Sequence, residues 1–539
     1  MVGPGGRRKH WGWGPESAQL GREQLEAAAP QVRERLGFGG EEIAEPVPLD
    51  AVELREPRVQ PPASLAGICA IDVYERASHA LGKAYRDVVR GFRGEFENPP
   101  DVVARPREEA DVERVLAWCA ESGLAAIPYG GGTSVVGGVE PDVDGAYAGA
   151  VTIDLSALDQ VLEVDEVSRA ARIQAGALGP ALEDQLRPTG LTLRHFPQSF
   201  ELSTLGGWIA TRAGGHFATR LTHIDDLVES VRAITPAGEW ESRRLPGSGA
   251  GPSPDRLLIG SEGILGVITE AWMRLQARPV HKLSCGVSFA DFHDAARAVR
   301  ELSQSGLDPA NCRLLDATEA EVTGAGPAGK ALLVLGFESA HHPVEHDMEI
   351  AIEVVREHGG EPGDVRGGGA KGEDAVGSWR SAFLAAPYLR DTFVALGVLS
   401  DTFETAITWD RFAEFHSTVM ESAGAAVAEV CGMAPAGPGS PRLSCRFTHV
   451  YPDGPAPYFT VLAPAKRGGE VEQWDEIKAA ASEAVIAGGG TITHHHAVGR
   501  DHRPWYDRQR PDSFADALRA AKRELDPSGV LNPGVLIDP

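Results

Sequence analysis

A glycine-rich segment in the first third of the chain has the composition of a phosphate-binding loop. It reads Pro128-Tyr129-Gly130-Gly131-Gly132-Thr133-Ser134 and follows a short apolar run, 125–128. Glycine adopts positive φ without strain, and consecutive N–H groups can then converge on an anion. The threonine and serine hydroxyls can donate to the same oxygens. The segment lacks the lysine of a P-loop and the G-x-G-x-x-G pattern, so taken alone it more often marks a surface turn.

Three later segments repeat this concentration of glycine, serine and threonine. They span 195–208, 211–215 and 260–270. Small residues let the backbone press against a flat ligand, because no side chain stands in the way. Four such segments in one chain favour a bound ligand over four unrelated turns.

A run of three histidines, His494-His495-His496, could carry two kinds of chemistry. Imidazole titrates near neutrality and can move protons, and several imidazoles together can bind zinc. On a strand, neighbouring side chains point to opposite faces, so three consecutive histidines rarely reach one ion. We therefore predict no metal site and expect at least one of the three to face away from the reacting groups. The six cysteines are scattered singly, without metal or redox spacing, which fits a reducing compartment.

Strands and helices must bring these segments together. Apolar residues at 112, 115, 116 and 119 follow the i, i+3, i+4, i+7 pattern and predict a helix over 107–123. Strands are predicted at 125–128, 151–155 and 171–175, and further helices at 23–36, 180–186 and 513–525. A second mixed region, 280–493, is broken by glycine-rich stretches at 359–372 and 432–441. The alternation of strands and helices predicts an α+β fold.

Composition limits the classes of partner. The 539-residue chain has ordinary hydrophobic and charged fractions, as expected for a globular protein of several domains. Its formal net charge of −26 disfavours nucleic acid and anionic membrane surfaces, although one pocket can still be positive. No apolar run approaches the roughly 20 residues of a membrane span, and no signal peptide is evident. We expect a cytoplasmic protein without an integral membrane segment, with peripheral membrane association left open.

Taken together, in this order and spacing, the four glycine-rich segments resemble the FAD-binding half of the vanillyl-alcohol-oxidase (PCMH-type) family. The resemblance implies an α+β fold with a PCMH-type FAD-binding domain and a cap domain that contains an antiparallel sheet. It divides the chain into an N-terminal helical extension (1–95), the FAD-binding domain (96–278), the cap or substrate domain (279–495) and a C-terminal helical segment that returns to the FAD domain (496–539). Non-covalent FAD is implied, because 129–134 contains no histidine for attachment. The residues expected to bind FAD are Pro128, Tyr129, Gly130, Gly131, Gly132, Thr133, Ser134, Gln198, Ser199, Ser203, Thr204, Gly206, Thr211, Gly214, Glu262, Gly263, Leu265, Gly266, Val267 and Ile268.

A narrower resemblance is to the alkylglycerone-phosphate synthase branch of that family. It covers about residues 10 to 534 and begins at Trp11-Gly12-Trp13-Gly14. It continues through 195–208, 313–316, 388–391, 403–406, 409–411, 445–446, 458–459 and 494–496. The resemblance implies an ether-lipid enzyme that exchanges the acyl group of an acyl-dihydroxyacetone phosphate for a fatty alcohol. In that branch the exchange proceeds through a flavin N5 adduct with no net redox change.

The same resemblance implies roles for individual residues. Tyr458 matches the catalytic acid/base tyrosine, and Arg390 matches the substrate-binding arginine, whose guanidinium can bind phosphate through paired donors. The other matches to catalytic positions are His494, His495, His496, Arg313 and His195. Structural interpretations stay open: Tyr458 could simply pack in a strand, Arg390 could pair with Asp391 at the surface, and Arg313 and His195 could serve the fold alone.

Two other functions also stay open. The D-2-hydroxyacid dehydrogenases of the same superfamily hold a divalent metal with two histidines and a glutamate. Here His449 occupies the first of those positions, but Tyr458 and His495 stand where the second histidine and the glutamate are expected, which argues against metal-assisted oxidation. The alternative is an FAD-linked oxidase or dehydrogenase of a D-2-hydroxyacid or another small alcohol or carboxylate; a non-catalytic flavin-binding protein is third. The family also suggests a homodimer.

Overall fold

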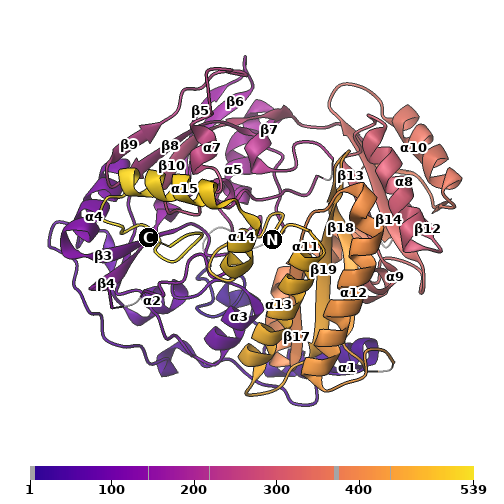
Figure 1. The fold of residues 1–539 in the computed structure, drawn as a ribbon, viewed down its shortest axis with the longest axis horizontal. Helices are drawn as coiled ribbons and strands as arrows, with labels where there is room; N and C mark the ends of the chain where they lie inside the picture. Colours follow the sequence, from indigo (N-terminus) through magenta and orange to yellow (C-terminus); the bar gives the residue numbers. More distant parts are fainter. Residues whose placement is uncertain (1–5, 144, 218, 369–374, 438, 539) are drawn as a thin grey trace.

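Four β-sheets with helices packed on them make up the described part of the chain (Figure 1). The computed structural model describes residues 6–143, 145–217, 219–368, 375–437 and 439–538, with the backbone alone for 375–384. The predicted glycine-rich break at 359–372 therefore lies partly outside the described residues. Helices and antiparallel sheets are combined with a short parallel sheet, which confirms the α+β fold class.

The first sheet carries the glycine-rich loop at the end of one strand. Its order is β1 (Cys69–Ala70), β2 (Val102–Ala104), β4 (Gly149–Asp154) and β3 (Leu124–Tyr129), with β2, β4 and β3 parallel. The crossover from β2 to β3 is α4 (Glu109–Ser122), which buries Val112, Val115, Leu116 and Cys119, as the apolar period predicts. Since β3 ends at Tyr129, the loop 130–134 lies at the carboxyl end of a parallel strand, where open α/β sheets bind ligands.

A second, antiparallel sheet supports two more of the glycine-rich segments. Its order is β5 (Val161–Asp165), β6 (Ala170–Gln174), β10 (Val267–Arg274), β8 (Val228–Thr235) and β9 (Gly238–Glu241). The segment 260–266 leads into β10, and α6 (Leu205–Thr211) packs on β6 and β10. The helices α5 (Gly179–Leu186) and α7 (Asp255–Leu258) and the small sheet of β7 (Leu191–Thr192) with β11 (Gln276–Ala277) complete this part.

The large sheet forms the other half of the molecule, on the right of Figure 1. Its order is β15 (Glu361–Pro362), β12 (His281–Phe289), β14 (Ala331–Ser339), β13 (Asn311–Leu315), β18 (Arg442–Val450), β19 (Pro455–Pro464) and β17 (Val398–Glu404), with β16 (Arg366–Gly367) also paired to β12. The helices packed on it are α8 (Phe292–Gln304), α9 (Ala317–Thr323), α10 (Glu345–Glu357), α11 (Ala375–Ala395), α12 (Trp409–Cys431) and α13 (Glu470–Ala487). All of its strand pairs are antiparallel.

Register in this sheet decides which side chains share a face. Tyr458 on β19 pairs with Glu404 on β17 and with Arg446 on β18. Directly paired residues project from the same face of a sheet, and residues two apart along one strand do so too. The alternate residues Phe403, Phe459 and Cys445 are buried in the core beneath the helices. One face of β17, β19 and β18 therefore carries polar side chains over an apolar core.

The two ends of the chain pack against both halves of the molecule. At the N-terminal end lie α1 (Arg22–Leu36), α2 (Val73–Ser78) and α3 (Tyr85–Phe92), and α3 contacts α11 and α13. At the C-terminal end α14 (Arg503–Gln509) and α15 (Asp512–Leu525) lead back to the first sheet. There, Ala126 N–H donates to Val530 and Asn532 N–H donates to the Ala126 carbonyl.

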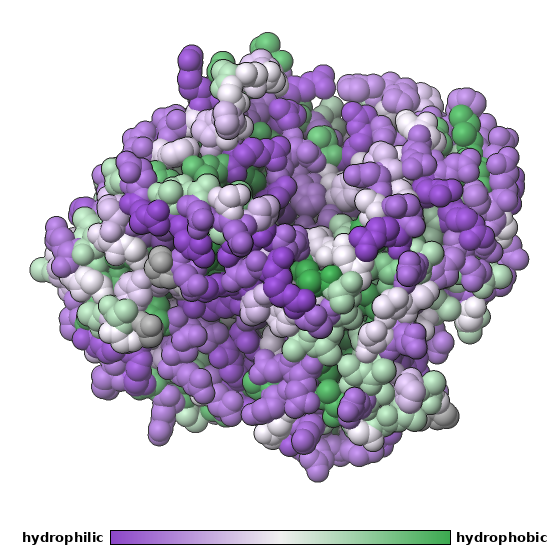
Figure 2. Space-filling model, in the orientation of Figure 1, coloured by the Kyte–Doolittle hydropathy of each residue, from purple (hydrophilic) through white to green (hydrophobic). Residues whose placement is uncertain are grey.

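The face drawn in Figure 2 is mostly hydrophilic, with apolar side chains in small groups. Across the described residues, no helix combines the length and apolar character that a membrane crossing requires.

Candidate active site

A cavity of about 1190 Å³ lies between the glycine-rich segments and the polar face of the large sheet. Residues from the segments 128–135 and 197–214 line one side, with Glu262, Gly263, Gly266 and Ile268. The other side is lined by residues from β17, β18 and β19, and by α11, α1 and the loop 495–497. The cavity therefore joins parts of the chain that lie far apart in the sequence.

The glycine loop makes a cradle that side chains would fill. A Cβ on Gly131 would overlap the Leu202 carbonyl oxygen, and a Cβ on Gly130 would overlap the Thr204 hydroxyl. Gly132 has φ +65° and its Cβ would overlap the Tyr129 hydroxyl. In the described structure, the N–H groups of residues 131–134 make no hydrogen bond within the protein. Partly buried N–H groups need a partner, so this loop fits the diphosphate of a dinucleotide such as FAD.

Almost all residues predicted to bind the cofactor line this cavity. The exceptions are Leu265 and Val267, whose side chains are fully buried in the core of the first half of the molecule. Leu265 and Val267 were predicted to bind FAD because they belong to a glycine-rich segment. In that segment the neighbouring Gly263 and Gly266 do line the cavity.

Glu262 is the one carboxylate in the predicted cofactor-binding set. Its carboxylate accepts N–H bonds from Val498 at 2.8 Å and Gly499 at 2.7 Å. Burial raises the pKa of Glu262 to about 7, and these two N–H donors act in the opposite direction. The side chain thereby links the cofactor loop to the segment that follows the histidine run.

The floor of the cavity is the polar face of three neighbouring strands. The alternate residues that line it are Ser400, Thr402, Tyr458, Thr460, Leu462, Arg442 and Arg446. Tyr458 donates its hydroxyl hydrogen to Thr402 Oγ1 at 2.9 Å, and the Arg446 guanidinium carbon lies 4.0 Å from the centroid of the Tyr458 ring. Burial raises the pKa of Tyr458, and the positive charge of Arg446 opposes that rise.

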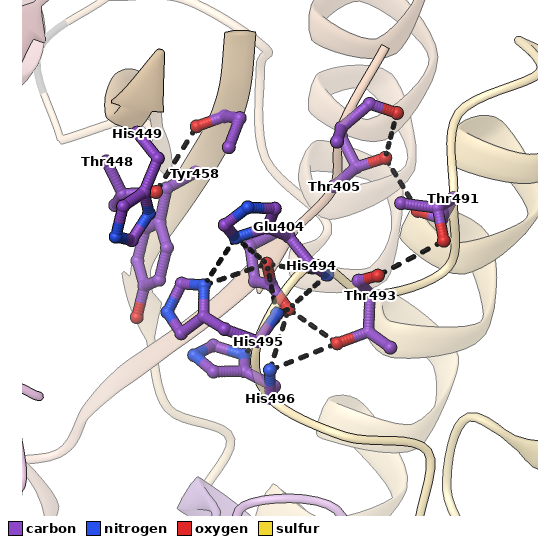
Figure 3. A network of polar contacts seen from close by, with 12 residues as sticks. Glu404, Thr405, Thr448, His449, Tyr458, Thr491, Thr493, His494, His495 and His496 are labelled. Carbon is purple, nitrogen blue, oxygen red and sulfur yellow. Dashed lines mark hydrogen bonds and ion pairs between the residues drawn. The ribbon is translucent and has the colours of Figure 1, made fainter. Parts of the chain in front are cut away.

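Glu404 lies next to Tyr458, and the three histidines surround its carboxylate (Figure 3). Its carboxylate accepts N–H bonds from His494, His495 and His496 at 2.9–3.2 Å, and the Thr493 hydroxyl at 2.6 Å. The histidines therefore lie in a loop, and the strand assumed from the sequence is wrong. Their three backbone N–H groups all point to the Glu404 carboxylate, whereas in a strand successive N–H groups would point in opposite directions.

The three histidines have different surroundings. His495 and His496 line the cavity, whereas His494 does not and instead contacts His223 and Tyr451. Burial lowers the pKa of His496 to about 3, and burial with the neighbouring His495 and His223 holds the pKa of His494 well below its ordinary value. Both rings are therefore neutral at physiological pH.

One group of histidines is compact enough for a metal ion. Ring nitrogens of His449, His494 and His495 lie within 4.8 Å of one another, the one such group among the described residues. Nδ1 of His494 lies 2.9 Å from Nδ1 of His495, a hydrogen-bond distance. That contact already occupies one nitrogen of each ring, and the absence of a metal ion stays a prediction.

Arg390 lines the cavity from α11. Its guanidinium lies 3.5 Å from Asp401 and donates to the Lys83 carbonyl at 2.8 Å. The neighbouring Asp391 pairs with Lys9 at 2.7 Å. Arg390 is therefore aimed at the cavity and not held in a surface pair with Asp391.

Arg313 and His195 lie behind the cavity lining. Arg313 on β13 is fully buried and donates to the His216 carbonyl at 2.9 Å, and burial lowers its pKa to about 9. His195 is fully buried, its ring centroid lies 5.2 Å from that of Trp208, and burial lowers its pKa to about 3. Their catalytic roles stay predictions, and any such role would act through neighbouring residues in this arrangement.

Sequence reasoning gave no role to Glu404, Arg446, His223 and Tyr451. The segments 403–406 and 445–446 are parts of the family resemblance, but only strand register shows that their polar residues flank Tyr458. Nothing in the local pattern around His223 or Tyr451 marks them, because their contact with His494 joins segments more than 40 residues apart.

Comparisons with known proteins agree with this architecture. A family model described as FAD binding domain matches residues 100–242, and one described as FAD linked oxidases, C-terminal domain, matches residues 278–536. An alkyldihydroxyacetonephosphate synthase from Caenorhabditis elegans is 30% identical over 502 residues, covering 86% of this chain and 80% of the relative. The glycolate oxidase subunit GlcD of Bacillus subtilis (strain 168) is 26% identical over 451 residues, covering 82% and 89%. A solved alkyldihydroxyacetonephosphate synthase superposes with a TM-score of 0.79 at 24% identity, covering 97% of this chain and 98% of that one.

Proposed function

Because this chain and the alkyldihydroxyacetonephosphate synthases belong to one FAD-binding family, we propose that the protein exchanges the acyl group of an acyl-dihydroxyacetone phosphate for a fatty alcohol. The product would be an ether lipid precursor, and the fatty acid would be released. Such a reaction requires three things of the protein. It must remove one proton from the substrate, bind the substrate phosphate and bury two long alkyl chains.

FAD is the cofactor of this enzyme. The N–H groups of residues 131–134 and the small residues of 198–214 and 262–268 would hold it, and we propose that it is not covalently attached. Bound FAD supplies a ring that can accept an electron pair from a substrate carbon and return it.

Arg390 is proposed to bind the phosphate. A guanidinium offers paired N–H donors that match phosphate oxygens, and Arg390 lines the cavity beside the tyrosine. Its partner Asp401 also accepts from Trp474 and pairs with Lys478, so the acidic group remains compensated when Arg390 turns to a substrate.

Tyr458 is proposed to move the substrate proton. Its hydroxyl faces the cavity and holds its own proton toward Thr402 Oγ1 at 2.9 Å. Arg446 over the ring favours the phenolate form, which can take a proton from carbon, and the phenol can return it later.

The observation that carries the proposal is a group of apolar side chains in the cavity wall. Val32 and Leu36 of α1 line the cavity and cluster with Val322, Phe393 and Leu462, while charged residues such as Glu34 and Arg35 line it as well. Such a wall removes an alkyl chain from water, at roughly 0.8 kcal/mol for each buried CH₂ group. A small hydroxyacid would leave it unused.

Product analysis tests the proposal. The purified flavoprotein is incubated with palmitoyl-dihydroxyacetone phosphate and hexadecanol, and both lipid products are measured. We expect equal amounts of palmitate and of the hexadecyl ether, and a kcat/KM that falls as the alcohol is shortened. Absence of exchange at every chain length would contradict the proposal.

The second candidate is an FAD-linked dehydrogenase or oxidase of a D-2-hydroxyacid. The similarity to the glycolate oxidase subunit GlcD favours it, and Arg390 could bind a carboxylate as readily as a phosphate. Reduction of the flavin by D-lactate or D-2-hydroxyglutarate, without acyl exchange, would support this candidate.

A further inference from the structure

We propose that Glu404 is a positioning residue that fixes one tautomer of His495, with the proton on Nδ1, so that Nε2 accepts protons inside the cavity. The inference starts from contacts in which only one atom can be the donor. It concerns a residue to which neither the sequence patterns nor the similarity to relatives assigns a role.

The chain of contacts begins at His223. Its Nδ1 lies 3.1 Å from the Arg212 carbonyl oxygen, which can only accept. Burial lowers the pKa of His223, so the ring is neutral and carries a single proton. We therefore assign that proton to Nδ1, which leaves Nε2 of His223 as an acceptor.

His494 must donate to that acceptor. Its Nε2 lies 3.1 Å from Nε2 of His223 and 2.8 Å from the Tyr451 hydroxyl oxygen. Two lone pairs cannot face each other at this distance without repulsion, so Nε2 of His494 carries the proton. The neutral His494 ring then presents an unprotonated Nδ1.

His495 completes the chain. Its Nδ1 lies 2.9 Å from Nδ1 of His494 and 3.3 Å from a carboxylate oxygen of Glu404. Both partners can only accept, so Nδ1 of His495 carries a proton, and in the neutral form of the ring Nε2 is then the acceptor. Across the part of the chain that the structure describes, no hydrogen bond to Nε2 is formed.

The free nitrogen belongs to a ring at the reacting end of the cavity. His495 lines the cavity, and its side chain is 18% exposed. Its ring stacks with that of Tyr458, with centroids 6.0 Å apart and an interplanar angle of 20°. Figure 3 shows His495 between Glu404 and Tyr458.

Glu404 is held as a carboxylate. Burial alone would raise the pKa of Glu404, but the adjacent His495, which donates to its carboxylate, holds that pKa well below its ordinary value. Its oxygens are already oriented by the N–H groups of 494–496 and by the Thr493 hydroxyl. A fixed carboxylate behind an imidazole selects the tautomer and stabilises the imidazolium that forms when the far nitrogen takes a proton.

The proposed step moves one proton. A proton leaves the substrate or the Tyr458 hydroxyl, its electron pair stays on the atom that it left, and a new N–H bond forms at Nε2 of His495. The reverse transfer returns the proton when the product forms. The identity of the donor rests on the proposed function, whereas the tautomer does not.

The first test needs no variant and no substrate. Full-length flavoprotein with ¹⁵N-labelled histidine is examined by long-range ¹H–¹⁵N NMR near neutral pH, and the His495 signals among the 17 histidines are identified by their loss in His495→Asn. We expect a protonated Nδ1 and an unprotonated Nε2. A proton on Nε2 would overturn the proposal.

The second test removes the carboxylate. Glu404→Gln is compared with Glu483→Gln, which changes an exposed glutamate paired with Arg508. In Glu404→Gln we expect a mixture of His495 tautomers and an exchange rate lower by about 10²-fold or more, with wild-type values in the control. An unchanged tautomer and rate in a folded, flavin-loaded Glu404→Gln would refute the role.

The two proposals fail in different ways. A wild-type protein with the expected His495 tautomer but without acyl exchange would contradict the proposed function and support the role of Glu404. If Glu404→Gln does not fold, the wild-type spectrum still decides between the two tautomers.

Discussion

Tyr458 lies between a carboxylate and a guanidinium on neighbouring strands. Glu404 and Arg446 are its direct partners across β17 and β18, and its hydroxyl donates to Thr402. Such a setting can stabilise both protonation states of the phenol in turn, which is what a residue that removes and returns a proton needs.

Replacement of Tyr458 by phenylalanine tests that role. Tyr458→Phe removes the hydroxyl but keeps the ring over Arg446, so we expect an acyl-exchange rate lower by about 10²-fold or more with unchanged flavin content. The control is Tyr74→Phe, whose hydroxyl donates to the Arg8 carbonyl outside the cavity. Equal loss in both variants would indicate a general effect on the fold.

Glu262 predicts a pH dependence of stability. Its pKa is raised from 4.5 to about 7, so the folded protein binds more protons than the unfolded chain between these values. Wild-type stability must then fall as pH rises through this window, whereas Glu262→Gln has no such loss. We expect the unfolding free energy of Glu262→Gln relative to wild type to rise by up to about 3 kcal/mol between pH 4.5 and 7.5. Denaturation at a series of pH values measures it, and a flat difference would show that Glu262 is ionised throughout.

The position of a single residue in the candidate site was predictable only where that residue belongs to a sequence motif. Tyr458, Arg390, His495 and His496 line the cavity, as resemblance to a family suggested. Glu404 and Arg446 gained a role only through strand register, which one sequence does not reveal.

At the scale of elements, the loop after β3 is proposed to bind the diphosphate of FAD through its backbone N–H groups. In Gly131→Ala the new Cβ would overlap the Leu202 carbonyl oxygen, so the loop must move and its N–H groups lose their convergence. We expect the Kd for FAD to rise at least about tenfold, which corresponds to about 1.4 kcal/mol. Titration of the apoprotein with FAD measures this change.

The matched control is Gly145→Ala, where no heavy atom beyond the two neighbouring residues in the chain lies within 4 Å of the new Cβ. Its FAD affinity should equal that of the wild type. A Gly131→Ala protein that binds FAD with wild-type affinity would contradict the assignment of this loop.

The segment around Trp11-Gly12-Trp13-Gly14 contacts α11 through a buried ion pair and backbone hydrogen bonds. Lys9 and Asp391 form a buried pair at 2.7 Å, and the Trp13 N–H donates to the same carboxylate. Asp391→Ala would leave Lys9 buried without its partner, so we expect destabilisation by about 3–5 kcal/mol. Thermal unfolding measures it, and the double variant Lys9→Met/Asp391→Leu should recover most of the loss. A double variant as unstable as the single one would show that the charge pair is not the cause.

Elements with a clear apolar period were predicted well, and the loops were not. The helix expected over 107–123 is α4, Glu109–Ser122, because its buried stripe follows the helical repeat. The histidine run adopts a loop instead of a strand, because Glu404, some 90 residues earlier, gathers its N–H groups. A contact over that sequence separation has no local signature.

At the scale of the whole molecule, the cavity exists only because two halves meet. The glycine-rich loops come from the first half and the polar strand face from the second, while the N-terminal helix α1 contributes further lining residues. Resemblance to a family predicted this arrangement, whereas composition predicted only a globular chain with a net charge of −26. The expected homodimer and cytoplasmic location stay predictions.

The most direct test of the account is the flavin spectrum of the whole protein under anaerobic turnover. With palmitoyl-dihydroxyacetone phosphate and hexadecanol, we predict palmitate release over many turnovers while the flavin ends in its oxidised form, because exchange involves no net redox change. D-lactate and D-2-hydroxyglutarate should leave the flavin oxidised. Full reduction of the flavin by either hydroxyacid, with no palmitate released from the lipid, would contradict the account.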